Sequence, residues 1–226
     1  MDKHERQFDK ELQDLMRKLL RMAALAEGMI DMAINELVKR DEKLAERVPQ
    51  CEDEVNRLQM EIDEAALALL ATQQPVARDL RFILVATKIN SELERIGDLA
   101  INITENVRVL AREPPLKPLI DIPRMAELAR QMVRDSLESF AREDALLAQK
   151  VILSDDQVDA LKDQVLRELL TYMMGDPQAI GRAIALILIS RHLERVADHA
   201  TNIAEDVIYM VQARDVRHHK TPKDQS

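Results

Sequence analysis

The residues most able to do chemistry belong to a repeated acidic motif. Glu-Arg-x-x-Asp occurs at Glu94 to Asp98 and again at Glu194 to Asp198, and each copy is followed by Asn-Ile. On a helix with about 100° between residues, Glu94, Asp98, Asn102 and Glu105 share a sector of about 80°. The apolar positions of the same segment lie on nearly the opposite side, so the carboxylates are predicted to face away from the protein core.

This stripe of carboxylates indicates a cation site. Like charges four residues apart on a helix repel by a few tenths of a kcal/mol, and no basic residue stands at those steps in either copy. The preceding helix offers further oxygen donors in each copy. The candidate metal ligands are Glu52, Asn56, Glu94 and Asp98 in the first copy, and Asp155, Asp159, Glu194 and Asp198 in the second. Oxygen-only donors suit hard cations such as Mg, Ca, Mn or iron.

One alternative to this interpretation is open at this point. The stripe can be a solvated face with no ligand, which is the ordinary role of charged helix positions.

The second copy is expected to bind a cation more tightly than the first, because Asn56 is neutral where Asp159 is charged. His192 and His199 have no counterparts in the first copy, so we expect surface histidines rather than ligands.

The motif is part of a tandem repeat that organises the whole chain. Residues 89–109 and 189–209 share ten of 21 positions at a constant offset of 100 residues. Low Gly and Pro content favours helix throughout. The sequence therefore predicts an all-α fold, a tandem repeat of two antiparallel three-helix bundles. The six helices are expected at residues 5–47, 51–72, 76–111, 122–151, 155–174 and 177–213. The domains are expected at 1–112 and 122–213, joined by a Pro-rich linker at 113–121 and followed by a polar tail at 214–226.

Local signals place the helix boundaries. Asp176 before Pro177 is a capping side chain followed by a proline at the first helical position, and Gln74-Pro75 stands at the matching place in the first copy. Ser154 with Gln157 three residues later resembles a capping box that opens the fifth helix.

Composition excludes several classes of protein. The net charge of −9 and the 2% aromatic content argue against a nucleic-acid binder. The single cysteine allows no intrachain disulfide. The amino-terminal residues are charged and no apolar run approaches the roughly 20 residues of a membrane span. We therefore expect a cytoplasmic protein, at most held at the inner membrane through partners. No enzyme motif is recognised.

The motifs resemble those of the PhoU family, the regulators of bacterial phosphate uptake. The similarity rests on both acidic motifs and on a corner at Gln74-Pro75 with Asp79-Leu80-Arg81. It also includes the opening His4, Gln7, Phe8, Glu11 and Leu12, the segment Thr171-Tyr172-Met173-Met174 before Asp176-Pro177, and the ending Asp215-Val216-Arg217-His218. The match covers nearly the whole chain.

The resemblance implies a pair of three-helix bundles with metal sites on the outer acidic motifs and no catalytic activity. It implies an adaptor between the ATPase subunit of a phosphate ABC transporter and a sensor histidine kinase, which represses the phosphate-starvation response when phosphate is plentiful. We expect a homodimer with bound Mg, Mn or Fe ions. A rival hypothesis is a carboxylate-bridged metal protein with redox or hydrolytic activity.

A partner surface is predicted at the corner formed by Pro75, Asp79, Leu80 and Arg81, because exposed residues at a helix junction are free to contact another protein. The alternative is that Asp79 and Arg81 only cap and brace the third helix.

Overall fold

The regular structure of the chain is helical. The computed structural model describes residues 3–40, 45–214 and 216, and the described residues contain helices and no strand. The helices are α1 (Lys3–Lys39), η1 (Ala45–Arg47), α2 (Val48–Gln73), α3 (Ala77–Ala111), α4 (Asp121–Arg142), α5 (Ala145–Gly175), η2 (Pro177–Ala179) and α6 (Ile180–Gln212). This confirms the predicted all-α fold.

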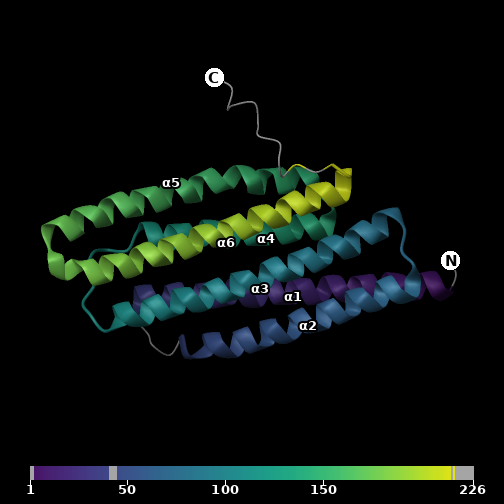
Figure 1. Cartoon of the computed structure of the whole chain (residues 1–226), viewed down its shortest axis with the longest axis horizontal. Coiled ribbons are helices and arrows are strands. Elements are labelled where there is room, and N and C mark those ends of the chain that lie inside the picture. Colours follow the sequence, from purple (N-terminus) through teal and green to yellow (C-terminus); the bar gives the residue numbers. More distant parts are fainter. Residues whose placement is uncertain (1–2, 41–44, 215, 217–226) are drawn as a thin grey trace, which may run out of the picture.

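The helices form two bundles of three. Helices α1, α2 and α3 pack against one another as unit one, and α4, α5 and α6 pack as unit two. Figure 1 shows α2, α3, α6 and α5 side by side in one layer, with α1 and α4 behind them. The units meet along α3 with α6 and along α1 with α4. The motif-bearing helix of each unit is therefore central and contacts its counterpart in the other unit.

Each unit is held together by aliphatic side chains at equivalent positions of the repeat. Leu93 and Ile96 in α3 are fully buried, as are Leu193 and Val196 in α6. Full burial of such a side chain contributes roughly 1.5–3 kcal/mol. Because these residues line one side of α3 and α6, they fix the rotation of both helices about their axes.

The first helix ends earlier than the sequence suggests. Helix α1 stops at Lys39 instead of residue 47, and Arg40 takes a left-handed conformation with φ of 57°. The guanidinium of Arg40 donates to the carbonyl oxygens of Leu110 and Ala111 at the end of α3, at 3.3 and 2.8 Å. This contact depends on the tertiary structure. Residues 41–44 lie outside the described part of the chain.

The predicted boundary between the fourth and fifth helices was wrong. Helix α4 ends at Arg142, and Glu143 takes a left-handed conformation with its N–H directed at carbonyl oxygens of the last turn. Asp144 then caps α5, accepting hydrogen bonds from the N–H groups of Leu146 and Leu147 at 2.9 and 3.0 Å. Ser154 lies inside α5 and donates to the carbonyl of Lys150 at 2.9 Å. A serine with a glutamine three residues later can thus occur within a helix as well as at its start.

The predicted cap at Asp176 was confirmed. The Asp176 side chain accepts a hydrogen bond from the N–H of Gln178 at 2.9 Å and caps η2, with Pro177 following it.

The linker residue Lys117 is buried and forms an ion pair with Glu168 of α5, so the Pro-rich segment is packed against unit two. Within the described residues, no helix combines the length and apolarity needed to cross a membrane. Most of the predicted polar tail lies outside the described residues.

The boundary between α4 and α5 can be tested by removing each capping candidate. Asp144→Ala removes a side chain that satisfies two backbone N–H groups, and we expect a loss of about 1 kcal/mol in the free energy of unfolding. Ser154→Ala is the matched control and should change it by less than about 0.5 kcal/mol. Urea denaturation measures both values, and the opposite ranking would contradict the observed boundary.

Candidate functional site

The acidic motifs lie outside the bundle cores, as predicted. Asp98 and Asp198 are exposed, and Glu94 and Glu194 are partly buried. The neighbouring Leu93 and Leu193 are fully buried on the core side of the same helices. The predicted separation of carboxylates from the core is therefore confirmed in both units.

In unit two, α5 and α6 bring four carboxylates into electrostatic contact. Burial, followed by the negative charges of Asp198, Asp159 and Glu194, raises the pKa of Asp155 to about 6. The pKa of Asp198 is also raised, first by the partial desolvation of its carboxylate beside α5 and then by Glu194 and Asp159. Both shifts show that negative charge at this cluster is energetically unfavourable in the folded protein.

Lys162 of α5 is part of this cluster and was missed by sequence reasoning. Its Nζ donates to Oδ1 of Asp159 at 2.7 Å and to Oε1 of Glu194 at 2.8 Å. Hydrogen bonds to these carboxylates raise the pKa of Lys162 well above its ordinary value. The available sequence signal was the i,i+3 spacing between Asp159 and Lys162, but the contact to Glu194 requires the packing of α5 on α6.

The unit-one cluster has a different composition. The pKa of Glu52 is raised by burial and then by the charges of Asp98, Asp53 and Glu105, and the pKa of Glu94 is raised by burial and Asp98. Asn56 is exposed. In both units, burial and neighbouring carboxylates raise the pKa values of the acidic side chains. The predicted ligands of unit one include one carboxylate fewer than those of unit two.

The clusters have the right donors for a hard cation but no ready-made cage. Carboxylate oxygens are the ligands that Mg²⁺, Mn²⁺ and iron accept. Within the described residues, no three Asp, Glu, His or Cys side chains are arranged so that they could together hold a metal ion. In unit two, one oxygen of Asp159 and one of Glu194 accept hydrogen bonds from Lys162, so these two side chains surround an ammonium group.

The contact between α3 and α6 includes polar pairs. Nδ1 of His199 lies 2.6 Å from Oε2 of Glu92, and the Asn202 side chain donates to the same oxygen at 3.1 Å. Farther along, Lys88 forms an ion pair with Asp206 at 2.7 Å. His199 is only 8% exposed, so the prediction of a surface histidine was wrong at this position. The reason is that the packing of one unit on the other is not visible in the periodicity of a single helix.

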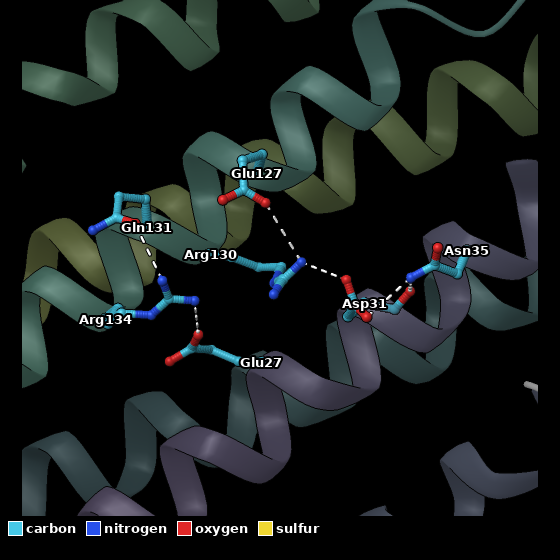
Figure 2. A network of polar contacts seen from close by, with 7 residues as sticks. All are labelled: Glu27, Asp31, Asn35, Glu127, Arg130, Gln131 and Arg134. Carbon is cyan, nitrogen blue, oxygen red and sulfur yellow. Dashed lines mark hydrogen bonds and ion pairs between the residues drawn. The ribbon is translucent and has the colours of Figure 1, made fainter.

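A second polar contact joins the units along α1 and α4. Figure 2 shows Arg130 of α4 directed at Asp31 of α1, and Arg134 directed at Glu27. The charged groups of Arg134 and Glu27 lie 2.9 Å apart. Asp31 also accepts a hydrogen bond from the side chain of Asn35. The interface between the units therefore carries charged pairs along both of its helix contacts.

The predicted partner corner is partly exposed. Leu80 is 37% exposed, while Pro75 and Asp79 are partly buried. The Nε of Arg81 donates to the carbonyl oxygen of Met210 in α6 at 3.2 Å. The alternative prediction was that Asp79 and Arg81 cap and brace the third helix. Arg81 does make a bracing contact, but with α6 instead of its own helix.

A family model described as the PhoU domain matches residues 19–107 and 122–207, one match in each unit. This chain belongs to the PhoU family. The expectation drawn from its motifs is confirmed.

Curated PhoU proteins match most of the chain. The phosphate-specific transport system accessory protein PhoU homolog of Aquifex aeolicus is 45% identical over 209 residues, covering 92% of this chain and 95% of the relative. The homolog of Pseudomonas aeruginosa is 41% identical, covering 94% and 88%. The phosphate-specific transport system accessory protein PhoU of Escherichia coli is 33% identical, with the same coverage of 94% and 88%.

Solved PhoU structures share the fold. The crystal structure of PhoU from Pseudomonas aeruginosa has a TM-score of 0.87 at 40% identity, covering 92% of this chain and 100% of that one. The phosphate transport system regulatory protein PhoU from Streptococcus pneumoniae has a TM-score of 0.83 at 28% identity, covering 92% and 99%. Together these neighbours confirm the all-α PhoU fold.

The raised pKa of Asp155 predicts a pH-dependent stability. Between its ordinary value of 3.8 and about 6 the folded protein holds the proton more tightly than the unfolded chain, so this group lowers stability as pH rises through that window. Asp155→Asn should therefore increase the free energy of unfolding at pH 7 by roughly 1 kcal/mol, a figure reduced for partial solvent exposure.

The gain should disappear near pH 4, where Asp155 is protonated in the folded state. The exposed neighbour Asp156→Asn is the control and should show a smaller gain at pH 7. Urea denaturation in the presence of a chelator at both pH values measures the difference, and an equal gain for Asp155→Asn at pH 4 and pH 7 would contradict the assignment.

Proposed function

We propose that this PhoU-family protein is an accessory regulator of phosphate transport that acts by contact. In this proposal it links the ATPase subunit of a phosphate ABC transporter to a sensor histidine kinase and represses the phosphate-starvation response when phosphate is plentiful. Family membership carries the proposal, since the matching relatives are named as accessory proteins of phosphate-specific transport systems. The proposed setting is the cytoplasm, with the protein as a homodimer.

Action by contact rather than by catalysis is supported by the relatives' names, which describe accessory and regulatory proteins. The side-chain cluster in unit two points the same way, because two of its carboxylates are engaged by Lys162. A redox or hydrolytic metalloprotein remains the rival hypothesis, and no specific contact in the described residues favours it.

The partner corner has an apolar surface suited to docking. Leu80 is followed one turn later by Leu84, which is 44% exposed, and preceded by Val76, which is 73% exposed. Neighbouring exposed apolar side chains of this kind mark interaction surfaces. Ile180 and Ile184 stand 100 residues after Leu80 and Leu84 and are likewise exposed. We propose that Pro75, Asp79 and Leu80 contact the partner, with Arg81 holding the corner against α6.

The acidic clusters are proposed to bind divalent or ferric ions such as Mg, Mn or Fe. Unit two would use Asp155, Asp159, Glu194 and Asp198, and unit one would use Glu52, Asn56, Glu94 and Asp98. The support is the accumulation of carboxylates whose pKa values are raised by burial and then by one another's charges. A bound cation would supply positive charge that relieves this repulsion.

The docking surface can be tested with charged substitutions at exposed apolar positions. Leu80→Asp combined with Leu84→Asp should leave the helical circular dichroism spectrum unchanged, because both side chains are partly solvated. Cells that carry this variant should express phosphate-starvation genes in phosphate-rich medium. The control is Val109→Asp on the same helix, which is 55% exposed and should keep repression intact. If deletion of the whole gene leaves those genes repressed, the adaptor proposal is wrong for this protein.

Metal binding can be tested by thermal stability. Adding Mn²⁺, Mg²⁺ or iron to chelator-treated protein should raise the melting temperature, because a ligand at 100 times its Kd stabilises the native state by about 2.7 kcal/mol. We expect Glu194→Gln with Asp198→Asn to remove more of this response than Glu94→Gln with Asp98→Asn. The absence of any response in the parent protein would identify the stripes as solvated faces.

A further inference from the structure

The end of unit two at which α5 turns back into α6 exposes apolar side chains from both helices. Met174 is 87% exposed, and Leu170 and Ile184 are 45% and 46% exposed. Figure 1 shows α5 and α6 side by side up to the turn that joins them. The exposed apolar set, called the second corner, consists of Leu166, Leu170 and Met174 of α5 with Ile180 and Ile184 of α6.

These side chains form a row on each helix. Leu166, Leu170 and Met174 follow one another at intervals of four residues and extend over about 12 Å. Ile180 and Ile184 repeat the same spacing on α6. Rows of apolar residues one helical turn apart form a surface on which an amphipathic helix can pack. The second corner therefore has the geometry to receive a helical segment of another protein.

The repeat gives the second corner a counterpart in unit one. Buried residues of α2 recur in α5 at an offset of 103 residues, since Val55 and Leu58 correspond to Val158 and Leu161. Between α3 and α6 the offset is 100 residues. The counterpart of the second corner is therefore the surface of α2 and α3 beside Leu80 of the predicted partner corner.

Three exposed matched positions carry opposite charge on these two surfaces. Unit one has two carboxylates and a serine there, whereas unit two has a leucine and two guanidinium groups. The pairs are Asp63 with Leu166, Glu64 with Arg167, and Ser91 with Arg191. The formal charge at these positions is therefore −2 in unit one and +2 in unit two.

Both arginines are exposed beside the apolar rows. Arg167 directly follows Leu166. Arg191 lies about one turn before Glu194, whose partner Lys162 lies one turn before Leu166, so Arg191 and Leu166 are at the same level of the helix pair. In the part of the chain that the structure describes, neither arginine has an ion-pair partner. Both guanidinium groups are therefore available to carboxylates of another molecule.

We propose that the second corner docks an amphipathic helix of a partner protein whose apolar face is flanked by acidic residues. The inference rests on action by contact, proposed above, and adds that the two corners select different partners by charge. The apolar rows receive the apolar face of the helix, and Arg167 and Arg191 pair with its carboxylates. Complementary charges across an interface favour the right partner and disfavour a wrong one. An adaptor with two such surfaces holds two partners that do not compete for the same site.

A membrane surface and a second copy of the chain are the competing occupants. The exposed Asp163 lies one turn before Arg167, Asp198 is exposed on α6, and the chain has a net charge of −9. Approach to an anionic lipid surface is therefore unfavourable. A two-fold contact of the second corner with itself places the same surface on both sides, so that arginines face arginines. An acidic helical segment meets neither form of repulsion.

The charge preference can be measured with the full chain and two labelled helical peptides of about 18 residues. Each peptide has leucines on one face, with glutamates on both flanks in one peptide and lysines in the other. Fluorescence anisotropy gives the dissociation constants. Arg167→Glu with Arg191→Glu should weaken binding of the glutamate peptide about tenfold, because two attractive pairs become repulsive, and should not weaken binding of the lysine peptide. Lys150→Glu, an exposed change at the other end of α5, is the matched control.

The apolar contribution is measured with the same glutamate peptide. Ile180→Asp with Ile184→Asp should weaken its binding at least about tenfold, because the apolar centre of an interface carries most of the affinity. Leu153→Asp is the control, since Leu153 is 71% exposed on α5 but lies outside the second corner. Circular dichroism of each variant verifies that the helices are retained.

The outcomes distinguish the possible occupants. Absence of glutamate-peptide binding by the parent, or equal binding by the parent and Ile180→Asp with Ile184→Asp, overturns the inference. Binding to anionic lipid vesicles that this variant loses would assign the corner to a membrane. A parent dimer that becomes a monomer in this variant, measured by analytical ultracentrifugation, would assign it to a second copy, and either result overturns the inference. Repression that persists after gene deletion contradicts the proposed regulatory role and leaves the peptide result intact.

Discussion

Burial of one aliphatic stripe on α3, and of its copy on α6, is the constraint on which the arrangement of the functional groups depends. Leu93 and Leu193 are fully buried, and the acidic residues that follow each of them are held on the other side of the helix. Rotating either helix to bury the carboxylates would cost several kcal/mol for each unpaired charge. The hydrophobic effect therefore fixes the orientation of charges that would repel one another on an isolated helix.

The two units are joined by polar pairs as well as by apolar packing. The buried hydrophobic residues of both units form one cluster, and the interface between units adds Glu92 with His199, Lys88 with Asp206, and Arg134 with Glu27. Glu92 is mostly buried and its pKa is lowered, because its hydrogen bonds to His199 and Asn202 outweigh the effect of burial. Buried pairs of this type need their partners in place, so they specify how one unit is positioned on the other.

The acidic clusters show how two copies of a repeat can differ in charge while they share one fold. Both units place carboxylates on an outer face of the same two helices, yet only unit two has Lys162 among them. A single side chain outside the core therefore changes the electrostatic state of one copy.

The sequence by itself determined the helical class, the two units and the outward direction of the acidic motifs, because these follow from apolar periodicity and from the offset of 100 residues between copies. It also determined the cap at Asp176, which depends only on adjacent residues. The tertiary structure decided what depends on contacts between segments. Asp144 rather than Ser154 caps α5, His199 is buried against Glu92, and Lys162 reaches Glu194 across two helices. Local sequence rules cannot choose between two residues that are each able to cap a helix. A histidine or lysine on a helix surface has no partner until another helix is packed against it.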